Sequence, residues 1–387
     1  MITSSEFTRF PKEWKVLPFL DVFNDVTSKG IKVKKENYDP EGTLPVVDQG
    51  KKLFGGFTDI ENKADVTLPA IIFGDHTKIF KLIDTEFAVG ADGVKLLEPK
   101  VEADKKFLFF YLNQLQLEDA GYSRHFKFLK ETYIPLPPLE TQKQIAAVLE
   151  KADQLRKDCK LLEQELNSLA QSVFIEMFGD NFATTHHTLG DVASVVSGVT
   201  KGQKFQNQVT VTAPYMRVAN VQAGYLNLNE IKSIEVKESD LQKYKLEVGD
   251  VLLTEGGDHD KLGRGAIWNG EVPNCIHQNH VFRVRLNTKL YTCEWFNGYL
   301  KTTYVKRYFL KCAKKTTNLA SINITQLKSL PMPDVTMERQ KKFEHIITSI
   351  NQQLSANLLQ LNDAQDYFNV LMQKAFSGEL NLANAKT

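Results

Sequence analysis

Residues 134–145 read Ile134-Pro-Leu-Pro-Pro-Leu-Glu-Thr-Gln-Lys-Gln-Ile145 and open a long heptad pattern that runs to Phe178. About 196 residues later, Leu330-Pro-Met-Pro333 and Glu338-Arg-Gln-Lys-Lys-Phe343 open a second pattern of the same kind, which ends near Phe376. A repeat of nearly half the chain predicts two globular halves, each followed by a long helix. Such a duplication is a natural scaffold for binding two separated parts of one extended target.

Both helical stretches carry apolar and small residues at alternating steps of three and four, which is the spacing of a coiled-coil seam. In the first helix the predicted seam comprises Ile145, Val148, Ala152, Leu155, Cys159, Leu162, Leu166, Leu169 and Val173. In the second helix it comprises Phe343, Ile347, Ile350, Leu354, Asn357, Leu361, Ala364, Phe368, Leu371 and Ala375. Asn357 is the polar exception, of a kind that often fixes the register of a coiled coil.

The ends of both helices are marked by residues that stop or cap a helix. Prolines at 137–138 and 331–333 prevent an earlier start. The predicted N-caps are Thr141 and Thr336, and the predicted C-caps are Gly179 and Gly378. Each helix of about 37 residues would be about 55 Å long. The two seams are buried most economically against each other as an antiparallel pair. The alternative is that each helix pairs with a different protein or with a second copy of this chain.

The predicted fold class is α+β, with two strand-rich globules, two long helices that form an antiparallel coiled coil, and pseudo-twofold symmetry. Segments 66–73 and 249–254 are predicted buried strands, and segments 105–116 and 294–311 are predicted helices. The predicted boundaries are 1–133 for the first globule, 134–180 for the first helix, 181–330 for the second globule, 331–380 for the second helix and 381–387 for a tail. The spacing of elements differs between the globules, as two different target sequences would require.

The composition is that of a globular protein with reduced cysteines. Hydrophobic residues make up 42% of the 387 residues and charged residues 25%, which is ordinary for such a protein. No apolar run reaches the roughly 18 residues of a membrane helix, and the first residues lack the basic and apolar blocks of a signal peptide. The four cysteines are Cys159, Cys275, Cys293 and Cys312. Their spacing does not suit zinc, which favours reduced thiols in the cytoplasm.

The net charge of +1 hides an asymmetry between the two halves. Residues 196–330 contain 19 Lys and Arg against 11 Asp and Glu, whereas residues 1–133 contain 19 against 21. A basic second globule suits a polyanionic partner such as nucleic acid. Charge alone does not predict the same for the first globule.

Candidate DNA contacts lie in loops after the predicted strands. Asn and Gln side chains can pair with adenine and Arg or Lys with guanine, while lysines and hydroxyls suit phosphates. In the first globule the candidates are Lys51, Lys52, His76, Lys78, Arg124, His125 and Lys127. In the second they are Arg217, Asn220, His259, Lys261, Arg264, His277, Gln278, Asn279, His280, Lys314, Lys315, Thr316, Thr317 and Asn318. Simpler interpretations stay open: loop 255–264 is only a turn, His277 and His280 merely adjoin a strand, and Lys314 and Lys315 form a solvated face.

Sequence motifs of catalysis are missing. There is no G-x-x-x-x-G-K-[ST] loop for ATP, no Asp/Asn-Pro-Pro-aromatic tetrad of the amino-methyltransferases, and no Gly-rich turn placed to bind S-adenosylmethionine. Neither a Cys-x-x-Cys nor a His-x-x-x-His metal spacing occurs, and no Ser/His/Asp set stands out. We therefore expect a binding protein with no catalytic residues and no metal site of its own.

Several of these segments resemble the motifs of DNA specificity (S) subunits of type I restriction–modification systems, and the resemblance covers nearly the whole chain. They are residues 134–145, Met177-Phe-Gly-Asp180, Leu189-Gly-Asp-Val192, Gly249-Asp-Val-Leu252, Gln278-Asn-His-Val-Phe-Arg283, and Thr316-Thr-Asn-Leu319 before Leu330-Pro-Met-Pro333. The start of the second helix departs from the family form, with Asp334-Val-Thr-Met337 in place of Pro-Leu-Glu.

The resemblance implies that each globule is a target recognition domain for one half of a bipartite, gapped DNA sequence. It implies that the helices hold the halves apart and dock two methyltransferase (M) subunits, which methylate adenine with S-adenosylmethionine. Restriction (R) subunits, which use ATP and Mg²⁺, would join for cleavage. Two alternatives remain: a recognition part of another class of restriction–modification enzyme, and a coiled-coil adaptor that does not bind DNA.

Overall fold

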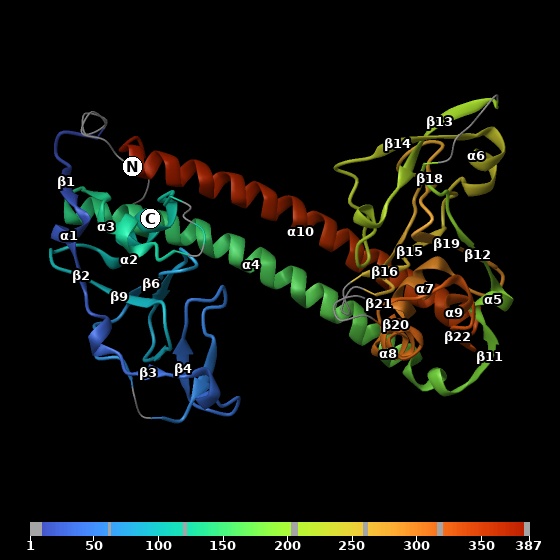
Figure 1. Cartoon of the computed structure of the whole chain (residues 1–387), viewed down its shortest axis with the longest axis horizontal. Helices are drawn as coiled ribbons and strands as arrows, with labels where there is room; N and C mark the ends of the chain where they lie inside the picture. Colours follow the sequence, from blue (N-terminus) through green and yellow to red (C-terminus); the bar gives the residue numbers. More distant parts are fainter. Residues whose placement is uncertain are drawn as a thin grey trace. The chain divides into compact units, whose positions relative to one another are not determined.

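The computed structural model describes residues 10–60, 63–118, 121, 123–202, 208–257, 262–315 and 320–382. The chain divides into two compact units. The first unit comprises Met1–Lys160 and Leu359–Thr387, and the second comprises Leu161–Leu358. Each unit therefore holds one globule together with one end of each long helix (Figure 1).

The globule of the first unit is built on a four-stranded antiparallel sheet in the order β2-β9-β6-β7. These strands are β2 (Phe23–Asp25), β6 (Ala70–Gly74), β7 (Phe80–Ile83) and β9 (Val94–Pro99). Every residue of β6 is buried, because its apolar sequence is covered on both faces of the sheet. Helix α2 (Lys105–Gln114), which corresponds to the predicted helix over 105–116, packs against β6 and β7.

A second sheet in this globule has the order β3-β8-β4-β5. Its strands are β3 (Lys32–Val33), β4 (Leu44–Val47), β5 (Gly56–Thr58) and β8 (Ala88–Gly90). Since β8 runs parallel to both β3 and β4, the carboxyl ends of these strands lie on the same side of the sheet. The remaining elements are β1 (Lys15–Pro18), its partner β10 (Tyr133–Leu136), α1 (Phe19–Val22) and α3 (Phe126–Lys130).

The globule of the second unit repeats this topology. Its antiparallel sheet β12-β19-β15-β17 matches β2-β9-β6-β7 strand for strand. In its second sheet, β14-β13-β18, the strands β13 and β18 are parallel as β4 and β8 are. The strands are β11 (Thr185–Thr188), β12 (Ala193–Ser197), β13 (Thr210–Met216), β14 (Lys232–Lys237), β15 (Val251–Thr254), β17 (Gly265–Ile267), β18 (Ile276–His277), β19 (Val281–Leu286) and β22 (Pro331–Pro333). The predicted duplication is therefore confirmed by the topology of the two globules.

The second globule also contains a small sheet in the order β16-β21-β20. Its strands are β16 (Gly256–Gly257), β20 (Lys314–Lys315) and β21 (Ala320–Ser321). The helices of this globule are α5 (Leu189–Val192), α6 (Glu238–Tyr244), α7 (Cys293–Leu300), α8 (Thr303–Cys312) and α9 (Ile324–Lys328). The prediction of one helix over 294–311 is wrong, because Thr302 starts a new helix: its hydroxyl accepts from the N–H of Val305 at 3.3 Å and caps α8.

Two long helices, α4 (Leu139–Phe178) and α10 (Met337–Ser377), each begin in one unit and end in the other. Thr336 precedes α10 directly, and its hydroxyl lies 3.5 Å from the N–H of Arg339, as expected of an N-cap. Thr141 is not a cap, because α4 already begins after Pro138. Gly378 follows α10 with a φ of +78°, the left-handed conformation of a C-cap. Gly179 follows α4 but opens a 3-10 turn.

The predicted seam of α10 is confirmed over its full length. Every member from Phe343 to Ala375 is buried or half-buried, including Asn357. Polar residues occupy most positions outside this line, so the hydrophobic pattern leaves a single choice of inward face.

The predicted seam of α4 is only half correct. Its members at every seventh position, Ile145, Ala152, Cys159, Leu166 and Val173, are buried or half-buried. Between them the inward residues are Leu149, Arg156, Glu163 and Ala170, each one position after the predicted one. Val148 is half-buried, whereas Leu155, Leu162 and Leu169 are 51%, 42% and 48% exposed. Neighbouring stripes on a helix lie about 100° apart, and apolar spacing alone did not distinguish them.

The helices pair in opposite directions within each unit. In the first unit, Arg156 near the start of α4 donates to the Oε1 atom of Gln365 near the end of α10 at 2.8 Å. Its guanidinium also lies 3.9 Å from the ring centre of Phe368. In the second unit, Phe174 near the end of α4 meets Phe343 at the start of α10, with ring centroids 5.2 Å apart. The predicted antiparallel arrangement is confirmed in both units.

A buried glutamine joins each globule to the start of its long helix. In the first unit, the Oε1 atom of Gln142 accepts from the N–H of Asp104 at 2.9 Å. In the second, the Oε1 atom of Gln340 accepts from the N–H of Thr292 at 2.9 Å. Asp104 and Thr292 are the N-caps of α2 and α7, so the two glutamines are equivalent by position and by contact.

Candidate nucleic-acid interface

Three loops of the first globule meet at the carboxyl ends of β4, β6 and β8. The side chain of Gln49 accepts a hydrogen bond from the N–H of His76 at 3.2 Å. The backbone carbonyl of Gln49 accepts from the hydroxyl of Thr77 at 2.7 Å. The N–H of Asp75 donates to the carbonyl of Gly93 at 2.7 Å. These bonds hold the three loops side by side.

Most of the predicted contacts of this globule lie on or beside these loops. Lys51, Lys52 and His76 are exposed, and Lys78 is half-buried. The segment 124–127 lies next to them, because the carboxylate of Asp75 accepts from the N–H of Phe126 at 2.8 Å. Arg124 and Lys127 on this segment are exposed. The tertiary structure therefore gathers basic side chains from two distant parts of the sequence.

Lys81 holds the loop that carries Lys51 and Lys52. Its ammonium group donates to the carbonyls of Asp48 at 2.7 Å and Leu53 at 3.2 Å. It also lies 3.5 Å from the carboxylate of Asp48. The side chain is only 4% exposed, and this burial lowers the pKa of Lys81 below its usual value although Asp48 opposes the effect. The sequence did not predict a role for Lys81 at the interface. The signal that could have indicated one is a lysine within the otherwise apolar segment 80–83.

Corresponding loops of the second globule also meet at strand ends. The N–H of Glu255, after β15, donates to the carbonyl of His280, after β18, at 3.0 Å. The carboxylate of Glu255 lies 2.6 Å from Nδ1 of His280. The N–H of Gln278 donates to the carbonyl of Met216 at 2.9 Å. Gln278 and Asn279 are half-buried and His280 is exposed.

A groove of about 520 Å³ adjoins this loop cluster. Its lining includes Glu255, His280 and Lys314, together with the glycines of β16. A carboxylate, an imidazole and an ammonium group thus share one surface, next to backbone groups without side chains. Such a surface can accept and donate hydrogen bonds to base edges and can attract phosphate.

Three predicted contacts are buried instead. Asn220 accepts from the N–H of Arg217 at 3.0 Å and donates to two backbone carbonyls. The ring of His277 lies 2.7 Å from the carbonyl of Val281, and burial lowers its pKa to about 4. His125 lies 3.0 Å from the carbonyl of Asp75. Their burial corrects the expectation of a DNA contact for these side chains, and the simpler interpretation as a neighbour of a strand applies to His277.

Two predicted arginines are held by neighbouring side chains. Arg217 donates to the carboxylate of Glu230 at 2.8 Å, and Arg264 donates to the Oε1 atom of Gln222 at 3.1 Å. Each would have to leave its partner before its guanidinium could pair bidentately with guanine. The other predicted contacts, His259, Lys261, Thr316, Thr317 and Asn318, lie outside the described residues, as does the side chain of Lys315.

Part of the positive charge of the second globule is internal. Arg283 is buried and donates to the carbonyls of Lys243 at 3.2 Å and Lys245 at 3.0 Å. Burial lowers its pKa. Arg285 forms two bonds, of 2.7 and 2.8 Å, with the carboxylate of Asp250. These arginines are engaged in contacts within the domain and so contribute less to the charge of the surface than the sequence count of positive residues suggests.

Within the described part of the chain, no group of three or more His, Cys, Asp or Glu side chains is arranged to hold a metal ion. No described helix is long and apolar enough to cross a membrane.

Comparisons with known proteins agree with these features. Residues 11–170 match the family model described as "Type I restriction modification DNA specificity domain". The chain is 27% identical over 175 residues to a protein of Methanocaldococcus jannaschii named as the MjaX specificity subunit of a type I restriction enzyme. That alignment covers 43% of this chain and 40% of the relative. The EcoKI specificity subunit of Escherichia coli K12 is 26% identical over 270 residues, which cover 64% of this chain and 57% of the relative.

These alignments span less than two thirds of the length of either relative. Among solved structures, the S subunit of a type I restriction-modification system from M. genitalium has a TM-score of 0.59 and 19% identity. The superposition covers 94% of this chain and 96% of that one. At this identity the likeness concerns the fold.

Proposed function

We propose that this chain is a member of the family of type I restriction–modification DNA specificity proteins, as the match over residues 11–170 supports, and that it selects the DNA sequence on which such a system acts. The observation that carries the proposal is the duplication of one globule topology with different loops at equivalent strand ends. Two similar domains with different loop residues suit two different half-sites. The DNA target would therefore be bipartite, with an unread gap between its halves.

The loop clusters described above are the proposed contacts. In the first globule, exposed lysines and Arg124 lie on or beside the loops that meet at Gln49, so cationic and amide groups occur in one region. In the second, Gln278, Asn279 and His280 lie beside the groove that contains Lys314. Lysines would bind phosphates and set position, while amide and imidazole groups would contact base edges.

The long helices are the proposed connection between the two DNA-recognition globules. Each helix passes from one unit to the other, and 40 residues of α4 correspond to about 60 Å of helix. The number of residues in α4 and α10 would then determine how many base pairs separate the half-sites.

We propose that the exposed leucines of α4 support docking of two methyltransferase subunits. Leu155, Leu162 and Leu169 recur every seven residues on the solvent side, and an apolar stripe of this kind is typical of a protein contact. Restriction subunits would join the same complex. The chain itself would contribute recognition only, with S-adenosylmethionine, ATP and Mg²⁺ acting in the partner subunits during adenine methylation and cleavage.

The competing functions are a recognition part of another restriction–modification class and an adaptor without DNA preference. An adaptor would bind partner proteins and show no preference among duplex sequences. A catalytic chain would transfer methyl groups from S-adenosylmethionine without partners, which we do not expect.

An exchange of the second globule tests the proposal directly. Residues 181–330 would be replaced by the equivalent segment of a related chain, and adenine methylation would be mapped across the genome of a host that carries the partner subunits. We expect one half-site to change while the other half-site and the gap stay the same. A change in both half-sites, or in neither, would contradict independent recognition by the two globules.

A further inference from the structure

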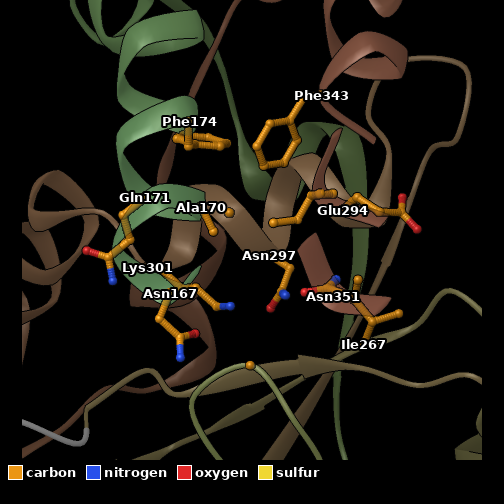
Figure 2. A pocket seen from close by; sticks show the side chains of 13 residues that line it. Asn167, Ala170, Gln171, Phe174, Ile267, Glu294, Asn297, Lys301, Phe343 and Asn351 are labelled. Atoms are coloured by element: carbon orange, nitrogen blue, oxygen red, sulfur yellow. The ribbon is translucent and has the colours of Figure 1, made fainter. Parts of the chain in front are cut away.

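A small cavity lies inside the second unit where α7 meets the end of α4 and the start of α10. Its volume is about 50 Å³, compared with about 30 Å³ per molecule of liquid water. Figure 2 shows Asn297 of α7 and Lys301, which follows α7 directly, pointing into this space, with Ala170 and Phe174 of α4 beside them. Asn351 of α10 also lines the cavity. The space suits a single small polar group rather than a base or a nucleotide.

Lys301 enters this cavity without a counterion. Among the described residues, no hydrogen bond or ion pair involves its ammonium group, and burial lowers the pKa of Lys301 below the ordinary value. Asn297, one turn earlier on α7, has a buried Oδ1 atom without a hydrogen-bond partner. Gly224 lies over the lysine so closely that a Cβ there would be 2.5 Å from its Nζ atom. A half-buried ammonium group without a counterion and an unpaired amide oxygen together form an incomplete polar site.

The two units can be compared position by position around this junction. Gln142 and Gln340 make equivalent contacts, which relates the starts of α4 and α10. Tyr111 donates to the carbonyl of Tyr133, just as Tyr299 donates to the carbonyl of Pro331. By this correspondence Asp153 of the first unit is replaced by Asn351 in the second, and Phe368 is replaced by Ala170.

In the first unit the cation near this junction is paired with a carboxylate, whereas in the second unit Lys301 is unpaired among the described residues. In the first unit, the guanidinium of Arg156 is bonded to the carboxylate of Asp153 and lies over the ring of Phe368. In the second unit the position of Arg156 holds Leu354, and the positions of the carboxylate and the ring hold Asn351 and Ala170. The cation there is Lys301, which occupies the position of Asn113. The second unit therefore has a cation from a different position and no carboxylate at the position of Asp153. Glu294 also lines the cavity, but among the described residues it forms no ion pair with Lys301.

We propose that this cavity binds one carboxylate group, with Lys301 as its counterion and the amide of Asn297 as a hydrogen-bond donor. A half-turn of the Asn297 amide exchanges its oxygen and nitrogen and directs the N–H groups at the carboxylate. The carboxylate belongs either to a small free acid or to an acidic side chain of a partner protein, since both present the same group.

A double-mutant cycle tests whether the site takes a carboxylate. Asn351→Asp places a carboxylate at the position equivalent to Asp153, and Lys301→Met removes the cation. We expect Asn351→Asp to raise the thermal midpoint by about 2 °C or more when Lys301 is present, and to give no rise in the Lys301→Met background. The matched control is Lys306→Met, an exposed lysine on the neighbouring helix α8, which should leave the rise intact. The same shift in both backgrounds, or no shift in either, would overturn the proposal.

The source of the carboxylate is decided by titration with sodium formate against sodium chloride at equal ionic strength. A saturable rise in the midpoint of the wild type, absent from Lys301→Met and Asn351→Asp, supports a small free acid. No rise with formate, together with a positive cycle, supports an acidic side chain of a partner. A formate response that is equal in the wild type and Lys301→Met, with no coupling in the cycle, would mean that the cavity holds only water.

Discussion

Two buried cations, Lys81 and Arg283, show how single residues shape the candidate interface. Each donates to backbone carbonyls of a neighbouring loop rather than to solvent. Their equivalents in the opposite globule are apolar: Ala266 pairs with Leu252 where Lys81 pairs with Ile72, and Leu96 pairs with Ile72 where Arg283 pairs with Leu252. The two globules therefore share one topology, but a cation at a different position holds a different loop in each.

The role of Lys81 predicts a local effect. Lys81→Met keeps the length of the side chain but leaves the carbonyls of Asp48 and Leu53 without their donor. A buried acceptor without a partner costs about 1–3 kcal/mol, so chemical denaturation should show a loss of that size for the first unit. DNA-binding assays should show weaker preference for one half-site only. Lys63→Met is the control, because the Lys63–Glu86 pair is exposed and such pairs contribute about 0–1 kcal/mol. Equal loss at both half-sites would contradict the local role.

Replacement of Lys314 and Lys315 should change DNA binding in a different way. As phosphate contacts, their replacement by Gln should weaken binding by a similar factor for every duplex sequence. Each lost contact should also reduce the slope of log affinity against log salt by about 0.9. Binding measured at several salt concentrations checks this, with Lys311→Gln on α8 as the control. A loss confined to one sequence would show that these residues contact bases.

At the scale of elements, the two long helices differ in how well their sequences specify the inward face. α10 carries one apolar line, whereas α4 carries two neighbouring lines that share every seventh residue. The choice on α4 depends on its partner, since Phe368 of α10 receives the Arg156 guanidinium instead of a leucine. The leucines of the line that does not face inward, Leu155, Leu162 and Leu169, remain exposed.

A pair of alanine substitutions checks the observed seam of α4. Leu149 is fully buried, and Leu149→Ala should cost about 2–5 kcal/mol. Leu155 lies on the predicted but exposed line, so Leu155→Ala should change stability by about 0.5 kcal/mol or less. Urea unfolding followed by circular dichroism measures both. Equal losses would contradict the observed seam, and a larger loss from Leu155→Ala than from Leu149→Ala would favour the seam predicted from spacing.

At the scale of the whole molecule, the chain contains two globules of the same topology, each followed by a long helix. Each long helix begins in one unit and ends in the other. The globule, the glutamine contact and the helix start recur in both copies. The proposed consequence is that helix length, rather than any side chain at the DNA, determines the gap in the target.

Removal of one heptad from each helix tests this consequence. Deletion of residues 157–163 and 357–363 shortens both helices by about 10 Å while keeping the inward faces aligned. The preferred gap should shorten by about 3 base pairs at 3.4 Å each, as read from the methylated sites, and both half-site sequences should stay unchanged. Deletion in α4 alone is the control and should destabilise the protein, because the seams no longer match. A change in half-site sequence would refute the proposed spacing role.

The sequence by itself determined the duplication, the two long helices, their antiparallel pairing and the complete seam of α10. These features depend on proline positions and heptad spacing, which act over a few neighbouring residues and can be read along the chain. The class of residue at the candidate interface was also predictable, since loops after strands carry Lys51, Lys52, His280 and Lys314 to exposed positions.

Only the tertiary structure decided which of the basic and polar residues are internal and which apolar line of α4 faces inward. Lys81 and Arg283 are buried and donate to carbonyls that lie 28 to 40 residues away in the sequence. Asn220 and His277 are also buried, and Lys301 is half-buried beside a cavity. Burial of this kind depends on which distant segments become neighbours, because a hydrogen bond to a remote carbonyl leaves no periodic pattern around the residue that makes it.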